Sequence, residues 1–228
     1  YRNAYITDNN LSLSGTYGFL PYRVSLGYLN QDGVLKTSNF ERGTLGVNLS
    51  PTFLNDHLTA NVNFKGAKTN SVFANEGAIG SAIIFDPTQP VYGPADKFGG
   101  YFQWEDEDGW NTLAPANPLS QLYQRDDRGE VNRWIGNVQL DYKFHFLPEL
   151  RANLNVGTDR SDSEGSIVTS ADYAPNTWGV QTISRYAQEK ENNLFDFYLN
   201  YQKEFGTGKS RVDATAGYSY QEFISESP

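Results

Sequence analysis

The chain has 228 residues with a net charge of −9 and no cysteine, so disulfides and thiolate metal sites are excluded. The acidic balance argues against a nucleic-acid partner, because phosphate binding requires a basic surface. With 38% hydrophobic and 14% aromatic residues, the chain is too aromatic to be disordered and too polar to be a helical membrane protein. It contains no run of about 18 apolar residues, which a membrane-spanning helix requires.

Residues alternate with a period of two in the first third of the chain, and this period predicts β-strands with two unlike faces. Apolar residues such as Leu45 and Val62 fall on one face, whereas polar residues such as Asn48 and Asn63 fall on the other. A tight turn is expected over 51–56. The pattern predicts four strands, which cover residues 11–15, 22–30, 40–50 and 57–68.

No sustained alternation occurs between residue 69 and about residue 131, where Gly, Pro, Asp and aromatic residues are frequent. A compact soluble domain rarely contains so long a segment without strands. Recurring Ala and Ile residues predict one short helix within 74–84, although its Gly residues weaken that prediction. Alternation then resumes, and the first of the later strands is expected to be the longest of all. These four strands are predicted over 134–146, 150–159, 195–201 and 211–223.

The connections between the strands alternate between short and long, and the two longest are polar loops over about 69–131 and 160–192. Such alternation is typical of outer-membrane barrels, which have tight periplasmic turns and long extracellular loops. Strands of about 9–12 residues suit a tilted crossing of the hydrocarbon layer. Aromatic residues near the strand ends fit the interfacial girdles of such barrels, namely Tyr28, Phe53, Trp134, Phe146, Tyr201 and Phe205.

We therefore predict an all-β fold, in which residues 1–228 form about eight strands of one transmembrane antiparallel β-barrel with long extracellular loops. If the short turns are periplasmic, both ends of the chain lie on the extracellular side. A complete bacterial barrel has both ends in the periplasm. The chain is thus expected to be a portion of a larger barrel, either as a fragment or with the other strands on other chains. A soluble sandwich or lipocalin-like barrel is the alternative.

The two faces of the strands are expected to meet different surroundings, because a wide barrel points apolar residues into lipid and polar residues into its lumen. A soluble fold would instead bury the apolar face in a core. The lipid-facing set is predicted to comprise Leu45, Val47, Leu49, Leu58, Ala60, Val62, Phe64, Val138, Leu140, Leu154, Phe197 and Leu199. The lumen-facing set is predicted to comprise Arg42, Asn61, Asn63, Lys65, Asn137, Gln139, Asp141, Lys143, Arg151, Asn153 and Asn155.

Three groups of residues resemble the SusC-like (SusC/RagA) TonB-dependent outer-membrane transporters of Bacteroidetes. They are YRVSLGYLNQDG at 22–33, FDPTQPVY at 85–92 with NPL at 117–119, and GNVQLDY at 136–142 with LPELRANL at 147–154. The resemblance runs across most of the chain in the same order. It implies a barrel of about 22 strands that is filled by an N-terminal plug and lidded by a SusD-like surface lipoprotein.

The resemblance also implies import of oligosaccharides or peptides, with energy relayed through the TonB complex. The plug, the TonB-contacting segment and the closing C-terminal strand of that family are not found among these residues. The resemblance therefore implies a portion of a transporter barrel. Its expected partners are the remaining barrel and plug segments, the SusD-like lipoprotein, the substrate and outer-membrane lipid.

The first long loop carries the candidate binding residues Tyr92, Tyr101, Trp104, Trp110 and Tyr123. Exposed aromatic rings stack on sugar faces and anchor protein partners, so this set is predicted to contact a ligand or a partner. The alternative is that these rings pack the loop against itself or against the barrel mouth.

An acidic run at 105–108 is the densest in the chain. Its alternating carboxylates Asp106 and Asp108 predict a Ca²⁺ site, which requires about six to eight oxygen ligands, whereas a solvated loop face explains the same run. The two histidines, His57 and His145, have no Ser or Cys nucleophile nearby, so no hydrolase is predicted.

These observations favour part of an outer-membrane nutrient importer that is not an enzyme. The alternative is a free-standing small outer-membrane β-barrel that binds a ligand or adheres to a surface. An outer-membrane hydrolase is a third hypothesis, which the absent nucleophile–base pair disfavours.

Overall fold

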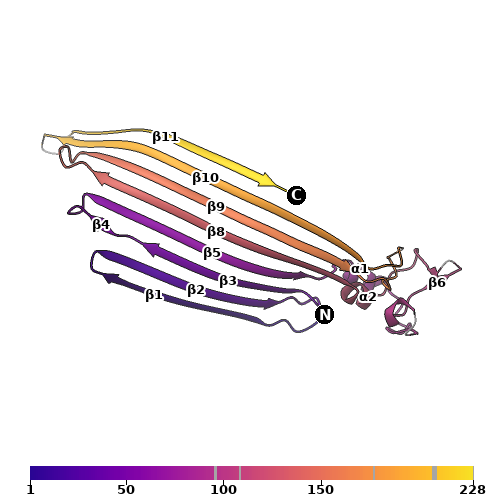
Figure 1. The fold of residues 1–228 in the computed structure, drawn as a ribbon. Coiled ribbons are helices and arrows are strands. Elements are labelled where there is room, and N and C mark those ends of the chain that lie inside the picture. The colour runs from indigo at the N-terminus through magenta and orange to yellow at the C-terminus, as the bar shows by residue number, and fades with distance from the viewer. Residues whose placement is uncertain (95–96, 108, 177, 207–209, 228) are drawn as a thin grey trace.

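The computed structural model describes residues 1–94, 97–107, 109–176, 178–206 and 210–227. Long antiparallel strands make up most of the chain, and the short helices and a small hairpin lie together in one long connection (Figure 1). The elements are β1 (Ile6–Tyr17), β2 (Leu20–Asp32), β3 (Asn39–Leu49), β4 (Thr52–Phe53), β5 (Leu58–Phe73), α1 (Gly77–Ile84), η1 (Phe98–Gly100), β6 (Glu105–Asp106), β7 (Gly109–Trp110), α2 (Pro118–Tyr123), β8 (Arg125–Lys143), β9 (Leu150–Thr169), β10 (Thr182–Phe205) and β11 (Ser210–Glu226).

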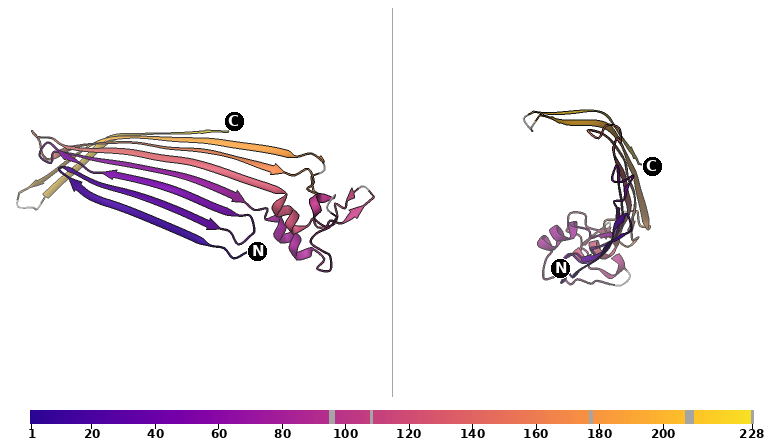
Figure 2. Two further views of the ribbon diagram at one scale, coloured as in Figure 1. Left: turned by 60° about the horizontal axis from the view of Figure 1, so that its bottom comes forward. Right: turned by 90° about the vertical axis from the view of Figure 1, so that its left-hand side faces the viewer.

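The long strands form one antiparallel sheet in the order β1-β2-β3-β5-β8-β9-β10-β11, and β4 adds a short pairing to β5. Each long strand pairs with the next one in the chain, as in the wall of an up-and-down barrel. The sheet curves into an arc, with β1 and β11 at its two edges (Figure 2). Within the described residues β1 and β11 do not pair with each other. An open arc is therefore found where the free-standing barrel hypothesis requires a closed one.

The number and order of the long strands are confirmed, but the second long loop is corrected. β9 continues to Thr169 and β10 begins at Thr182, so most of the segment expected as loop over 160–192 is strand. Polar residues occupy both faces of this part of the hairpin, as Arg160 and Ser161 do. When both faces are polar, the alternation that identifies a strand is absent.

The first long loop is also shorter than expected. β5 and β8 extend into it from its two sides, so it spans 74–124 rather than 69–131. β8 ends at Lys143, which corrects the strand expected over 134–146, and the 24-residue β10 is the longest strand instead. The tight turn expected over 51–56 is confirmed, with three consecutive residues of positive φ, Leu54, Asn55 and Asp56.

Residues 74–124 fold into a unit, called here the loop unit, at the end of the sheet opposite the tight turns (Figure 1). Its α1 confirms the short helix expected within 74–84. Its α2 begins after the N-cap residue Asn117 with Pro118 at the first helical position, a combination that favours a helix start. The loop unit lies on the concave side of the arc (Figure 2). In the part of the chain that is described, no helix has both the length and the apolar character to span a membrane.

Candidate functional site

The cross-strand register gathers the predicted lipid-facing set on one face of the sheet. Leu49 lies opposite Val62, Val62 lies opposite Val138, and Leu154 lies opposite both Leu140 and Phe197. Paired residues point to the same face of a sheet, so the set shares one face, as predicted. One complete row across the sheet consists of Tyr22, Leu49, Val62, Val138, Val156, Phe195 and Tyr220.

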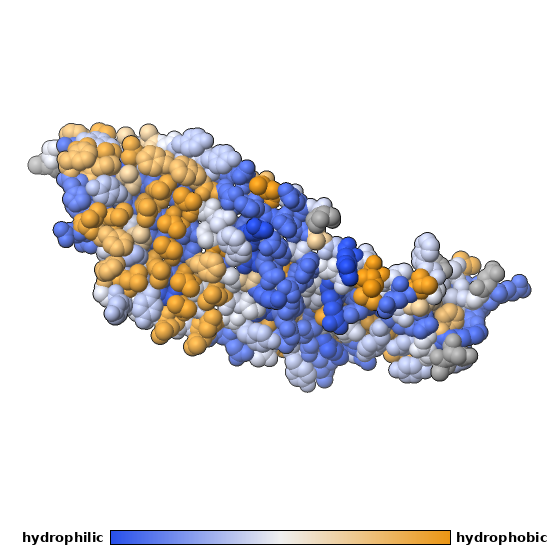
Figure 3. Space-filling model, viewed as in Figure 1, coloured by the Kyte–Doolittle hydropathy of each residue, from blue (hydrophilic) through white to orange (hydrophobic). Residues whose placement is uncertain are grey.

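This face, called here the apolar face, lies on the convex side of the arc (Figures 2 and 3). Large apolar side chains on it are exposed, such as Leu26 at 52% and Phe64 at 39%. Figure 3 shows hydrophobic surface gathered over the turn end of the sheet and hydrophilic surface over the loop end. An exposed apolar surface of this extent marks a face that meets lipid or protein.

The apolar face becomes charged toward the loop end. Lys68 Nζ lies 2.7 Å from Glu130 Oε1, and Arg160 forms ion pairs with Asp162 at 3.3 Å and Glu189 at 3.5 Å. Exposed ion pairs contribute less than about 1 kcal/mol each, so these residues add little stability. They mark instead a surface that is in contact with water.

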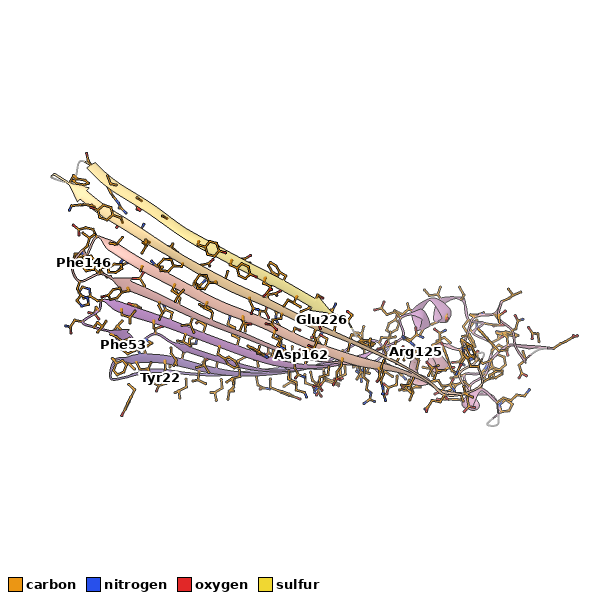
Figure 4. All side chains as sticks on the ribbon, turned by 45° about the horizontal axis from the view of Figure 1, so that its top comes forward. Tyr22, Phe53, Arg125, Phe146, Asp162 and Glu226 are labelled. Carbon is orange, nitrogen blue, oxygen red and sulfur yellow. The ribbon has the colours of Figure 1, made fainter. Side chains whose placement is uncertain are left out.

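The aromatic residues expected in the girdles lie toward the two ends of the apolar band. The apolar band is the set of apolar rows on the apolar face, where a row consists of residues paired across successive strands. Tyr28 lies in the row of Lys68, at the loop end of this band, and Trp134 lies one row nearer the turns. The other four lie toward the tight turns, as Figure 4 shows for two of them, and are Phe53, Phe146, Tyr201 and Phe205.

The concave face carries the predicted lumen-facing set, and its side chains bond to one another across strands. Asn137 Nδ2 donates to Asn155 Oδ1 at 2.6 Å, and Asn155 Nδ2 donates to Asp196 Oδ2 at 3.3 Å. Ser219 Oγ donates to the other oxygen of Asp196 at 2.5 Å, so a polar ladder crosses four strands from β8 to β11. Each such bond contributes about 0.5–1.5 kcal/mol, and the ladder makes this face suited to water or a polar partner.

Asn117 connects the parts of the loop unit. Its residue surface is only 1% exposed, and its Nδ2 donates to the carbonyls of Val91 at 2.8 Å and Phe102 at 3.1 Å. Its Oδ1 accepts from the N–H groups of Leu119 and Ser120 at the start of α2, which is the N-cap arrangement. One buried amide thus holds two extended segments against the first turn of a helix.

Three of the candidate binding residues, Tyr92, Tyr101 and Tyr123, come together and are called here the tyrosine cluster. The Tyr92 and Tyr101 rings lie 5.7 Å apart between centroids, and the two residues form an isolated β-bridge. Burial raises the pKa of the Tyr101 hydroxyl, and the nearby Tyr92 and Tyr123 hydroxyls raise it further. Tyr92 is 66% exposed and Tyr123 is 53% exposed, so the cluster presents two open rings to solvent.

The two candidate tryptophans make contacts inside the loop unit. The Trp104 ring packs edge-on against Phe102, with the centroids 5.5 Å apart. Trp110 lies in β7, and its buried Nε1 has no hydrogen-bond partner among the described residues. The alternative that these rings pack the loop against itself is therefore supported for Trp104, whereas Trp110 keeps an unused donor.

The acidic run lies in the small hairpin of β6 and β7. Asp106 is opposite Gly109, and Asp108 falls outside the described residues. Glu105 forms an ion pair with Lys97 at 2.6 Å. Over the described ranges, no three His, Cys, Asp or Glu side chains come close enough to hold a metal ion. Calcium binding by Asp106 and Asp108 stays a prediction.

The histidines come together at the turn end, which their separation in the sequence did not indicate. The rings of His57 and His145 stack in parallel with 3.7 Å between centroids. His57 Nδ1 is 2.7 Å from the Lys143 carbonyl oxygen, and His145 Nδ1 is 3.0 Å from the Tyr142 hydroxyl. These contacts join the start of β5 to the turn after β8, and they give the pair a structural explanation.

A curved antiparallel sheet with an exposed apolar convex face and a hydrogen-bonded polar concave face is part of the wall of a β-barrel. In sequence, the chain is 38% identical to the TonB-dependent receptor SusC of Bacteroides thetaiotaomicron over 239 residues, which cover 98% of this chain and 23% of SusC. It is 26% identical to the TonB-dependent receptor P26 of Formosa agariphila, covering 97% of this chain and 21% of that receptor. No protein-family model matches the chain.

Solved structures agree on the fold. The RagAB peptide transporter matches with a TM-score of 0.70 at 17% identity, over 97% of this chain and 25% of that chain. The siderophore receptor PiuA from Acinetobacter baumannii matches with a TM-score of 0.52 at 14% identity, over 97% of this chain and 30% of that chain. Together with the sequence matches, these findings identify the chain as a SusC-like segment of a TonB-dependent receptor barrel. The chain spans 23% of the length of SusC. The relatives that it matches are receptors and transporters.

Proposed function

We propose that the chain forms part of the wall of a TonB-dependent nutrient importer in the bacterial outer membrane, without chemistry of its own. The observation that carries the proposal is the apolar convex face, backed by a polar ladder on the concave face, in a chain 38% identical to SusC. Apolar residues outside and polar residues inside are the arrangement of a wide membrane barrel. The plug, the other strands and the contact with TonB belong to parts of the transporter beyond this segment.

The proposed cargo is an oligosaccharide or a peptide, and the proposed extracellular partner is a SusD-like lipoprotein. The similarity in fold to the RagAB peptide transporter supports a peptide, and the resemblance to the SusC-like family implies the oligosaccharide and the lipoprotein. The tyrosine cluster is the proposed contact, because the open rings of Tyr92 and Tyr123 can stack on sugar faces or anchor a partner.

Uptake by living cells tests the proposal. The full-length transporter that contains this segment is expressed in a strain that lacks it, and uptake of labelled oligosaccharides and labelled peptides is followed. Replacing Tyr92 and Tyr123 together with Ala should lower uptake about tenfold, the size of effect expected for a central aromatic contact. Phe146→Ala is the matched control, because it removes an exposed ring, 81% exposed, at the opposite end of the sheet.

The two parts of the proposal fail separately. If the unaltered transporter takes up neither class of cargo, the importer function is wrong. If it takes up cargo and the double tyrosine variant does so equally well, the importer function stands and the tyrosine cluster is not the contact.

A further inference from the structure

Two glycines on the apolar face, Gly43 and Gly66, lie inside strands although no contact among the described residues requires a glycine there. A Cβ added at Gly43 would meet no atom within 4 Å, and one added at Gly66 would meet only the Phe64 ring, at 3.7 Å. Neither glycine has a positive φ. By contrast, the ring of Tyr186 occupies the space above Gly165 on the other face. Glycine costs about 0.5–1 kcal/mol in a strand relative to alanine, so glycines without an internal reason mark a close approach from outside.

The two glycines form the floor of a hollow of about 1010 Å³ on the convex face. On its turn side the hollow is apolar, because Gly66 shares a row with Leu45 and Trp134. On its loop side the rim is polar, because Gly43 shares a row with Lys68. The volume is at the upper end of the range for ligand pockets, about 300–1,000 Å³. The hollow therefore extends from the apolar band to the charged part of the same face toward the loop end, where Lys68 lies.

A second hollow of about 580 Å³ lies beside the first and deeper in the apolar band. Its lining includes Gly136, Val138 and Phe195, and Gly136 lies opposite Phe64 on β5. A Cβ added at Gly136 would meet only Thr158 Cγ2, at 3.8 Å. The three glycines thus follow a diagonal across β3, β5 and β8, from the polar rim into the apolar band.

We propose that this diagonal binds one phosphorylated lipid of the outer leaflet, with an acyl chain over Gly66 and Gly136 and the phosphate beside Lys68. The proposal rests on the membrane location proposed above. The Lys68 side chain is 57% exposed. Its ammonium group has three donors, of which Glu130 takes one at 2.7 Å, so donors remain for phosphate oxygens. Trp134 beside the hollow has the amphipathic ring that is enriched at membrane interfaces.

Charge favours a lipid over a second copy of this chain in the hollow. The chain carries a net charge of −9, and next to the hollow the three carboxylates of Glu130, Asp162 and Glu189 outnumber their ion-pair partners Lys68 and Arg160. A symmetric contact between two copies would bring these like charges together, whereas a phosphate beside Lys68 meets a cation.

Native mass spectrometry of the full-length transporter in detergent tests the proposal. The probes are phosphorylated lipid A and the same glycolipid without its phosphate. One phosphorylated lipid is expected to bind, and the double variant Gly43→Leu with Gly66→Leu should lose it, because a Cβ fits at both positions without a clash and the rest of each leucine would occupy the hollow. Ala216→Leu is the matched control, since it adds a leucine to the same face, in the row of Leu199 and away from the hollow.

Charge variants test the phosphate contact. Lys68→Gln should lower the affinity about fivefold, the contribution of one lysine near an anionic lipid surface. Lys65→Gln, on the opposite face of the same strand, should leave it unchanged. Glu130→Gln breaks the same ion pair but frees Lys68, so the affinity for the phosphorylated lipid should stay the same or rise. If Lys68→Gln and Glu130→Gln weaken binding equally, the pair is merely structural and the proposal is wrong.

Other outcomes also overturn the proposal. They are equal binding of the glycolipid without phosphate, retention of the lipid by the double leucine variant, and loss of the lipid in the Ala216 control. If the double leucine variant instead loses self-association in sedimentation while lipid binding is unchanged, the hollow is a contact between copies. Spin labels at positions 61 and 62 report the membrane location independently, so failure of the location and failure of the lipid site are distinguishable.

Discussion

Replacing Asn117 with Ala should open the loop unit without unfolding the sheet. The change removes the N-cap of α2, which costs about 0.5–2 kcal/mol. It also leaves the carbonyls of Val91 and Phe102 without their side-chain donor, at about 1–3 kcal/mol for each carbonyl that stays buried. If one of the two carbonyls stays buried, the two losses add to about 1.5–5 kcal/mol of local stability. The strand pairings of β5 and β8 do not involve Asn117 and should persist.

Hydrogen–deuterium exchange of the full-length transporter measures this local opening. Backbone amides of the described residues within 91–121 should exchange at least about tenfold faster in the variant, since 1.4 kcal/mol corresponds to a factor of ten. Amides of β9 and β10 should keep their protection. Asn111→Ala is the matched control, because among the described residues the Asn111 side chain makes only a local bond, in which it accepts from the N–H of Leu113 at 2.9 Å. Unchanged exchange in the Asn117 variant, or equal acceleration in the Asn111 control, would refute the reasoning.

Three further predictions concern the two faces and the loop. Val62→Arg should cost about 2–4 kcal/mol of unfolding free energy in lipid vesicles, whereas Asn61→Arg should be nearly neutral, and a spin label at 62 should be relaxed by lipid-dissolved oxygen. The reverse accessibility at 61 and 62 would contradict the membrane location. Calorimetric titration with Ca²⁺ should give heat that disappears when Asp106 and Asp108 are both replaced with Ala, and an absence of heat in the unaltered transporter ends the calcium prediction. Tyr186→Ala should lower local stability at the loop end of β9 and β10 by at most about 1 kcal/mol, measured by hydrogen exchange. Tyr186→Phe should lower it less, because it keeps the ring over Gly165 and loses only the 3.4 Å hydroxyl bonds to Asp127 and to the Arg128 carbonyl.

The sequence predicts the strands where the two faces of the sheet differ, and fails where they do not. Val62 and Asn61 are neighbours with opposite polarity, so the strand that contains them is recognisable. In the outer half of β9, Arg160 and Ser161 are both polar, and the strand continues to Thr169 without any alternation to reveal it. The alternation is absent for a physical reason, because a strand with water on both faces does not require an apolar face.

The candidate site was predictable in composition but not in arrangement. The aromatic content of the first long loop points to a contact surface, whereas the meeting of Tyr92 with Tyr101 and Tyr123 depends on the fold of the loop unit. Asn117 followed by Pro118 is a local signal for a helix start. The reach of its side chain to distant carbonyls has no local signal, because those partners are fixed only by tertiary packing.

The boundary of the apolar band differs from strand to strand, and it bears on the membrane location proposed above. On β2 the last apolar residue of the convex face is Tyr28, which shares its row with Lys68. On β9 and β10 the continuous run of apolar residues ends at Val156 and Phe195, which share their row with Val62, three rows nearer the turns. A membrane surface perpendicular to the strands would keep this boundary within one row. The boundary thus lies nearer the turns on β9 and β10 than on β2, as expected if the strands cross a bilayer at a tilt, as strands of a closed barrel do, typically by about 35–45°.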